Sequence, residues 1–180
     1  LLEVVPEHGS ELSGLGIIGC RIGPGTAGGE DLLGNIRHFR RYFKAEDRIP
    51  GVLDSIELTG TTDFAMMLTA HKLRVVHVTT HVGIRRMLER VTTERVLTTI
   101  RLADRALRDM GVERPSVGVA GLNPHAGEGG LFGDEEQKTI TPAIEAAKAE
   151  GIAATGPWPA DTLFGRAVAG DFDVTVAMFH

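Results

Sequence analysis

A glycine-rich segment with a histidine near its middle is the part of the sequence best suited to bind a ligand. Residues 121–133 read Gly-Leu-Asn-Pro-His-Ala-Gly-Glu-Gly-Gly-Leu-Phe-Gly, with His125 at the centre and Glu128 nearby. Five glycines let backbone amides approach a ligand closely. A flexible surface connection is the alternative interpretation. We favour a functional loop because it follows an expected strand and precedes an expected helix, where α/β sheets place ligand-binding loops.

Two further histidines have the same place relative to expected strands. His81 follows an apolar run that ends in Val-Thr-Thr, and His180 follows a run that ends in Ala-Met-Phe. Because the carboxyl ends of parallel strands open onto one edge of a sheet, His81, His125 and His180 can converge on a single ion. Neutral imidazoles suit zinc and related metals, and three ligands leave open positions for substrate. We therefore predict a divalent metal site, with zinc preferred over magnesium or cobalt.

The other histidines are interpreted as structural or exposed. They are His8, His38, His71 and His77. His77 alternates inside an expected strand, which favours a core histidine with a hydrogen-bond partner.

The elements that must position these residues are regular from about residue 64 onward. Apolar runs predict strands at 64–69, 73–80, 116–120 and 174–178. Helices are expected at 93–110, 134–150 and about 162–169, the first between an N-cap at Thr92 and a stop at Gly111. The buried face of that first helix should comprise Val96, Ile100, Ala103, Leu107 and Met110. Strands that alternate with helices predict an α/β fold with a largely parallel or mixed sheet and flanking helices.

Two proline-containing segments leave alternatives open. Pro142 lies inside the second expected helix and indicates either a kink or a late start. Residues 156–162, Gly-Pro-Trp-Pro-Ala-Asp-Thr, indicate a stiff turn after which Asp161 would cap the next helix through its side chain. The sharper alternative for Asp161 is a contact with a ligand, namely the cofactor.

A dinucleotide-type pattern at residues 14–19, Gly-Leu-Gly-Ile-Ile-Gly, is interpreted as a coincidence. The Rossmann mechanism requires a strand immediately before the pattern and a helix immediately after it. The preceding residues make a poor strand, and Gly23, Pro24 and Gly25 interrupt any following helix. The region before residue 60 gives no convincing order of elements, although residues 36–44 could form a helix or an arm.

The composition is that of an ordinary globular protein. The 180 residues are 42% hydrophobic and 24% charged, with a net charge of −5, which argues against a nucleic-acid or acidic-membrane binder. Cys20 is the only cysteine, and no apolar run is long enough to span a bilayer. No leader peptide is visible. These features predict a cytoplasmic protein with no membrane segment.

Several of these segments together resemble one family. Residues 73–81, 121–130, 156–162 and 177–180 closely resemble the 4-hydroxythreonine-4-phosphate dehydrogenase (PdxA) family, which includes the threonate and erythronate 4-phosphate dehydrogenases. The resemblance divides the chain into a poorly matched segment, 1–55, and an α/β metal- and NAD-binding region, 56–180. It implies a fold like that of isocitrate and isopropylmalate dehydrogenases and a homodimer with active sites near the subunit boundary. It also places the family's three metal-binding histidines on His81, His125 and His180.

The implied activity is oxidation of a phosphorylated hydroxy acid by NAD or NADP. A bound metal would lower the pKa of the substrate hydroxyl, so that hydride passes to the cofactor. The leading substrate is 4-phosphooxy-L-threonine, oxidised with decarboxylation in pyridoxal phosphate biosynthesis. D-threonate or D-erythronate 4-phosphate, in sugar-acid catabolism, is the close alternative. A non-catalytic metal- or nucleotide-binding remnant is the alternative from a different class.

Two departures from the family pattern bear on activity. The family's Pro-Gly-His-Thr-Glu motif is replaced by Pro-Gly-Val-Leu-Asp at residues 50–54, so its substrate-binding His and Thr are missing. The sequence ends at His180, where the family continues with Asp-Gln-Gly and with substrate-binding Lys, Asn and Arg. The expectation is a fragment of a longer protein or a decayed homologue, in either case with an incomplete fold and substrate pocket.

Overall fold

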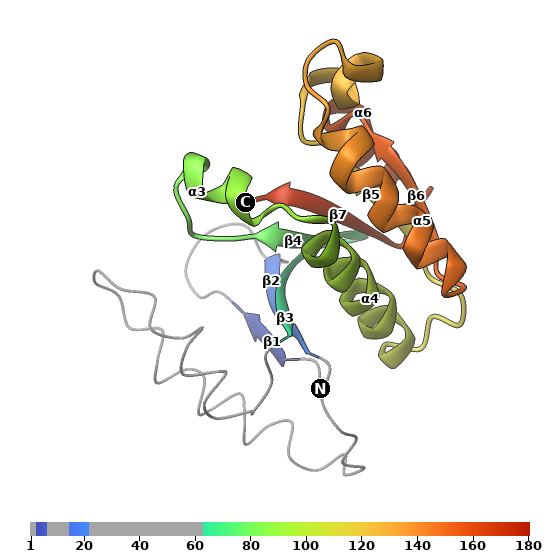
Figure 1. Cartoon of the computed structure of the whole chain (residues 1–180). Coiled ribbons are helices and arrows are strands. Elements are labelled where there is room, and N and C mark those ends of the chain that lie inside the picture. Colours follow the sequence, from blue (N-terminus) through green and yellow to red (C-terminus); the bar gives the residue numbers. More distant parts are fainter. Residues whose placement is uncertain (1–2, 7–14, 22–62) are drawn as a thin grey trace.

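A computed structural model describes residues 3–6, 15–21 and 63–180. These residues form one seven-stranded sheet with the strand order β1-β2-β3-β4-β7-β5-β6 (Figure 1). The strands are β1 Glu3–Pro6, β2 Leu15–Arg21, β3 Phe64–Ala70, β4 Leu73–Thr79, β5 Ser116–Ala120, β6 Ala153–Trp158 and β7 Val174–Phe179. The helical elements are α3 Ile84–Arg90, α4 Thr93–Asp109, η1 Pro124–Gly130, η2 Glu136–Ile140, α5 Thr141–Ala149 and α6 Ala160–Ala169. No helix in these ranges has the length and apolar character needed to cross a membrane.

The sheet has an antiparallel half and a parallel half. Strands β1 to β4 pair antiparallel in chain order, and β3 and β4 form a hairpin. Strand β7 then pairs parallel with β4 on one side and with β5 on the other, and β6 pairs parallel with β5. The prediction of an α/β fold with a mixed sheet is confirmed. The parallel half is the part that can bring strand ends to one functional edge.

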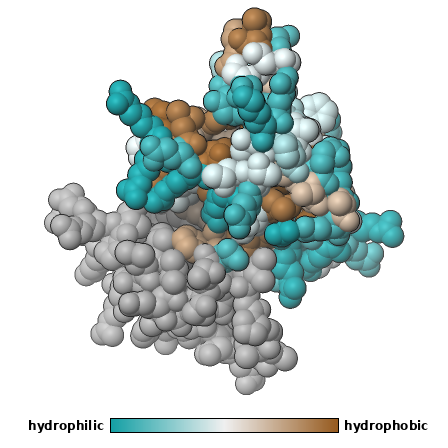
Figure 2. All heavy atoms as spheres, in the orientation of Figure 1, coloured by the Kyte–Doolittle hydropathy of each residue, from teal (hydrophilic) through white to brown (hydrophobic). Residues whose placement is uncertain are grey.

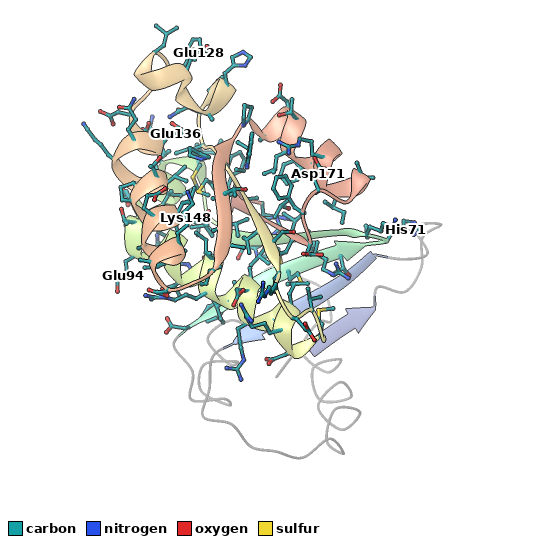
Figure 3. The ribbon with its side chains drawn as sticks, turned by 90° about the vertical axis from the view of Figure 1, so that its right-hand side faces the viewer. His71, Glu94, Glu128, Glu136, Lys148 and Asp171 are labelled. Carbon is teal, nitrogen blue, oxygen red and sulfur yellow. The ribbon has the colours of Figure 1, made fainter. Side chains whose placement is uncertain are left out.

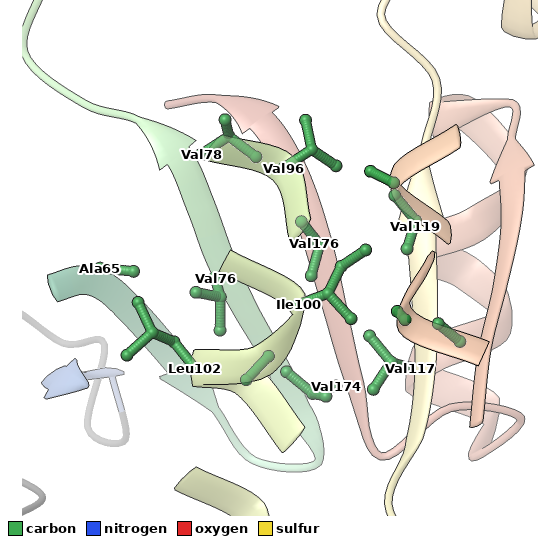
Figure 4. Close-up of a cluster of buried hydrophobic side chains, with 14 of the residues drawn as sticks. Ala65, Val76, Val78, Val96, Ile100, Leu102, Val117, Val119, Val174 and Val176 are labelled. Atoms are coloured by element: carbon green, nitrogen blue, oxygen red, sulfur yellow. The ribbon is translucent and has the colours of Figure 1, made fainter. Parts of the chain in front are cut away.

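Helices cover both faces of the parallel half. The main core joins α4 and α5 to one face of the sheet and includes Val76, Val176 and Ile100, all fully buried (Figure 4). A smaller cluster on the opposite face packs Leu163 and Ala167 of α6 against Phe172. Gly118 of β5 faces this second cluster, because a Cβ added there would lie 2.8 Å from a Leu163 methyl carbon. The arrangement is a three-layer α/β packing.

The longest helix follows the sequence pattern closely. Helix α4 begins after Thr92, whose hydroxyl oxygen accepts a hydrogen bond from the backbone N–H of Arg95 at 3.2 Å. The side chains expected on its buried face are buried except the last, Met110, which is 42% exposed just beyond the helix end. Arg95 ties the helix to the hairpin by donating to the Val78 and Phe64 carbonyls, both at 2.9 Å.

The expected helix 134–150 forms as two segments. A π-helical turn, η2, leads directly into α5, and Pro142 lies in the first turn of α5. The late-start interpretation of Pro142 is wrong, because Ile140 and Thr141 are already helical and α5 continues η2 without a break. The π-helical turn lies directly before the position where the proline removes a backbone N–H donor. The remaining expected helix begins two residues earlier than predicted, at Ala160.

Three sequence interpretations need correction or addition. Residues 156–158 of the expected turn at 156–162 instead form the end of strand β6, and Pro157 is tolerated there because β6 is an edge strand. The capping role of Asp161 is wrong, because Pro159 occupies the N-cap and no side chain caps α6. Helix α3 was not expected. The 14–19 pattern is confirmed as a coincidence because residues 15–21 form strand β2, while residues 36–44 and 50–54 lie outside the described residues.

Candidate functional site

The carboxyl ends of three neighbouring parallel strands bring the predicted ligands to one edge of the sheet. His81 follows β4 by two residues, His180 follows β7 directly, and His125 lies in η1, shortly after β5. Strand β7 lies between β4 and β5 and runs parallel to both, so the three chain exits share an edge. The predicted common edge is confirmed, and all three side chains are exposed there.

The structure brings two of these histidines together. The ring centres of His81 and His180 are 5.6 Å apart, with the rings tilted by 52°. Two imidazoles bound to one zinc ion place their ring centres about 5 Å apart, given nitrogen–zinc bonds of about 2.0–2.1 Å. This pair therefore has a spacing that suits a shared cation.

The third histidine does not join that pair in the described conformation. The ring of His125 instead lies beside the ring of Phe132, with ring centres 6.1 Å apart. Among residues 63–180, no three His, Cys, Asp or Glu side chains are placed so that they could hold one metal ion. The three-histidine site stays a prediction.

A fourth histidine supports the pair from the protein interior. His77 of β4 is buried as predicted, and its ring meets that of His180 edge-on at 5.1 Å. Burial lowers the pKa of His77 to about 4, an effect opposed by the Met66 backbone and increased by His180 and His81. The ring is therefore neutral at pH 7. The expected hydrogen-bond partner is the Met66 backbone, while the buried Nδ1 atom has no partner among the described residues.

The backbone at two of the three candidate ligands adopts the left-handed conformation. His81 and His125 both have φ of 52°, and the chain stays left-handed through Ala126, Gly127 and Glu128. This conformation is costly for residues with a Cβ, and it concentrates at functional sites when the surrounding structure enforces it. We call residues 121–133 the His125 loop.

A buried carboxylate lies beneath the His125 loop. Glu136 is 3% exposed, and its Oε1 accepts hydrogen bonds from the backbone N–H groups of Leu122 and Asn123, both at 2.7 Å. Its Oε2 accepts from the side-chain amide of Asn123 at 3.0 Å. Burial alone would raise the pKa of Glu136, but the hydrogen bonds from Asn123 and Leu122 outweigh it and lower the pKa below its usual value of 4.5. Figure 3 shows Glu136 nearer the body of the protein than Glu128, which lies at the outer end of the loop.

Sequence reasoning did not identify Glu136. A glutamate at the beginning of an expected helix is ordinary, because acidic residues favour helix N-termini. The one signal in the sequence was a pair of polar residues at the two ends of the glycine-rich segment: Asn123 lies near its start, and Glu136 follows its end. Asp161, the predicted cofactor contact, lies exposed in the first turn of α6, beyond the carboxyl end of β6.

Exposed apolar side chains flank the candidate edge. Ile84 and Leu88 of α3, which follows His81, are 74% and 49% exposed. Leu131 and Phe132, which follow η1, are 72% and 48% exposed. Figure 2 shows corresponding hydrophobic surface over α3 and at the tip of the His125 loop. Exposed apolar patches of this kind mark surfaces that contact another molecule.

The fold belongs to the α/β class in which ligands bind at the carboxyl ends of parallel strands. Residues 45–180 match the family described as "Pyridoxal phosphate biosynthetic protein PdxA". The chain belongs to this family. Its named relatives are dehydrogenases, so the family is one of oxidoreductases.

Relatives with two different substrate names match the same part of the chain. A D-threonate 4-phosphate dehydrogenase from Pectobacterium atrosepticum is 48% identical over 124 residues, which cover 69% of this chain and 38% of the relative. A 4-hydroxythreonine-4-phosphate dehydrogenase from Desulfosudis oleivorans is 53% identical over 124 residues, covering 68% and 37%. The chain thus spans less than two fifths of the length of these relatives.

Solved structures agree with the sequence comparisons. The crystal structure of 4-hydroxythreonine-4-phosphate dehydrogenase from Klebsiella pneumoniae superimposes with a TM-score of 0.71 at 43% sequence identity. The superposition covers 81% of this chain and 43% of that one. The predicted family is confirmed.

Proposed function

We propose that the protein is a metal-dependent dehydrogenase that oxidises a phosphorylated hydroxy acid with NAD or NADP. The observation that carries this proposal is the His81–His180 pair, with ring centres 5.6 Å apart at the carboxyl edge of β4 and β7. The family membership supports the reaction type. A divalent cation held there, zinc in first place, would lower the pKa of a substrate hydroxyl while the nicotinamide accepts the hydride.

The residues of this chain have separable tasks in that reaction. His81 and His180 bind the cation through neutral imidazole nitrogens. His77 packs edge-on against His180 and limits the orientations of that ring. The hydroxyl of Thr79 donates to the carbonyl of Met178 at 2.9 Å and fixes the ends of β4 and β7 relative to each other. Asp161 is proposed as a cofactor contact on the same side of the sheet.

His125 completes the site from a second copy of the chain in this proposal. The resemblance to the family implies active sites near the subunit boundary, and His125 lies apart from the other pair in a single chain. The exposed apolar side chains of α3 and of the His125 loop provide surface for such a contact. The protein would then be a homodimer whose metal sites each use both subunits.

Metal analysis of purified variants tests the site. His81→Ala and His125→Ala should each lose zinc, measured by inductively coupled plasma mass spectrometry after dialysis against a weak chelator. His71→Ala is the matched control, because His71 has the same φ of 52° but lies at the opposite end of β4, in the hairpin turn (Figure 3). Equal zinc in all three variants would refute the site.

Mixing two defective variants tests the shared subunit arrangement. If His125 comes from the second copy, unfolding and refolding His81→Ala together with His125→Ala produces mixed dimers with one intact site, and zinc binding returns. If both histidines come from one chain, each site in the mixed dimer stays defective. Failure of mixing to restore zinc, with dimers confirmed by size-exclusion chromatography, would contradict the arrangement.

The substrate is proposed as 4-phosphooxy-L-threonine, oxidised with decarboxylation, or as D-threonate 4-phosphate. The second candidate is supported by a relative that carries that name and is 48% identical, close to the 53% of the relative named for the first. Formation of NADH or NADPH by the full-length protein with each substrate, and release of carbon dioxide with the first, distinguishes them. Reduction of the cofactor with either substrate would exclude a non-catalytic remnant.

A further inference from the structure

Glu136 holds the start of the His125 loop through three hydrogen bonds that its carboxylate accepts. Its two carboxylate oxygens accept the backbone N–H groups of Leu122 and Asn123 and the side-chain amide of Asn123. The other carboxylate buried in the described part of the chain, Asp104, pairs with Arg108 of its own helix. Glu136 thus connects the helical segment after the loop to the strand exit before it.

The inside of the loop is shaped around this carboxylate. A Cβ added to Gly127 would lie 2.7 Å from Oε2 of Glu136, and one added to Gly121 would lie 3.1 Å from Oε1. Both distances are too short for a side chain to be accommodated without movement. Gly127 also has φ of 79°, a conformation that favours glycine. The loop closes over Glu136 because glycine occupies two positions at which a Cβ would crowd the carboxylate.

The π-helical turn η2 places Glu136 at this position. One additional residue in a helical turn changes the direction of the side chains that precede it, and such turns occur frequently at functional sites. Glu136 is the first residue of η2 and is buried, whereas its neighbours Glu135 and Gln137 are at least partly exposed. The turn therefore directs the carboxylate inward, beneath the loop.

We propose that Glu136 is a positioning residue that holds the His125 loop in the left-handed conformation from which His125 reaches the metal. The metal part of this proposal rests on the proposed function. The left-handed backbone at His125, Ala126 and Glu128 is unfavourable by itself and requires an external anchor. Hydrogen bonds to a charged carboxylate are stronger than those between neutral groups, so Glu136 can supply that anchor.

The test compares Glu136→Gln with Glu135→Gln in the full-length protein. Glu135 is the matched control: it is the adjacent glutamate, and it accepts only from the Asn123 side chain, at 2.6 Å, and from no backbone N–H of the loop. The first measurement is hydrogen exchange at the Leu122 and Asn123 amides. The second is the dissociation constant for Co²⁺, followed by the visible absorption of the bound ion. Thermal unfolding shows whether each variant is folded.

In Glu136→Gln, the backbone amides of Leu122 and Asn123 should exchange hydrogen at least about tenfold faster, and Co²⁺ should bind at least about tenfold more weakly. The reason is that each charge-assisted hydrogen bond that is lost is worth more than a neutral one. Glu135→Gln should change both quantities less, by about twofold at most, because it loses one part-buried side-chain contact and no bond to the loop backbone. A purely structural role would change the melting temperature without a selective loss of Co²⁺ affinity. If Glu136→Gln does not unfold cooperatively, Glu136→Asp replaces it, because a shorter carboxylate keeps the charge but not the reach.

The two proposals can fail separately. Unchanged amide exchange and unchanged Co²⁺ affinity in a folded Glu136→Gln variant would overturn the positioning role. Absence of Co²⁺ binding by the unsubstituted protein would overturn the metal site of the proposed function and the metal part of the positioning role. The amide exchange rates would still decide whether Glu136 holds the loop.

Discussion

Replacement of Gly127 by alanine should destabilise the protein through two effects that a second variant can separate. At φ of 79° any residue with a Cβ is strained, by roughly 1–2 kcal/mol. In addition, the new methyl group would lie 2.7 Å from Oε2 of the buried Glu136, which cannot move away without breaking its hydrogen bonds. Overpacking of this kind costs about 1–3 kcal/mol. The two effects together predict a loss of about 2–5 kcal/mol.

Gly129→Ala is the matched control for the backbone effect. Gly129 has φ of 66° in the same loop, and an added Cβ meets nothing within 4 Å. This variant should lose only the roughly 1–2 kcal/mol of backbone strain. Urea unfolding measured by circular dichroism gives both free energies of unfolding, and for a chain of this size each kcal/mol corresponds to about 2–4 °C in melting temperature. Equal losses in the two variants would refute the argument that Glu136 fills the inside of the loop.

Two further predictions concern the core and the response to acid. Ile100→Ala should lower the free energy of unfolding by about 2–5 kcal/mol because Ile100 is fully buried, whereas Val168→Ala, at a position 57% exposed, should change it by less than about 0.5 kcal/mol in the same urea titration. Because the pKa of Glu136 is lower in the folded protein than its usual value of 4.5, its contribution to stability is complete above that value and disappears as the pH falls through the folded pKa. Urea titrations of the protein and of Glu136→Gln should therefore differ most at neutral pH and converge in acid, and a constant difference at every pH would contradict this linkage.

The sequence was sufficient for elements whose pattern is long or strictly alternating. Helix α4 has a side-chain N-cap at Thr92 and a repeated apolar face, so its position differs from the expected one by a single residue. Strand β5 was predicted with its observed bounds because valine and glycine alternate between two flanking turns. In these cases local preference and burial favour the same structure.

Elements that depend on tertiary context were not predictable. Strand β6 contains Gly156 and Pro157, which locally indicate a turn, and it forms a strand because the edge of the sheet is available to it. Helix α3 is only seven residues long and carries three arginines, so its single buried residue, Met87, gave no periodic signal. Short elements of this kind form because neighbouring structure stabilises them.

For the candidate site, the sequence predicted that each histidine lies after the carboxyl end of a strand, but it did not predict the backbone conformation there. The sequence predicted that these strands share one sheet, but it did not give their order. The observed order β4-β7-β5 brings His81, His180 and His125 to one edge. The left-handed turn at His125 was not predictable, because five consecutive left-handed residues are unfavourable in isolation. Its cause lies in Glu136, which is eleven residues further along the chain.

The candidate ligands are exposed, so buried contacts at neighbouring positions must hold them in place. His81 follows β4, where the buried Thr79 hydroxyl binds the Met178 carbonyl of β7, and His125 lies in a loop anchored by the buried Glu136 carboxylate. Left-handed backbone at each histidine costs on the order of 1–3 kcal/mol, and such strain persists only where surrounding contacts enforce it. These few contacts are weaker than the main apolar core, which includes residues such as Val176 and Ile100. Loosening them should therefore release the histidines while the sheet remains folded, so the proposed metal binding should be lost before the fold.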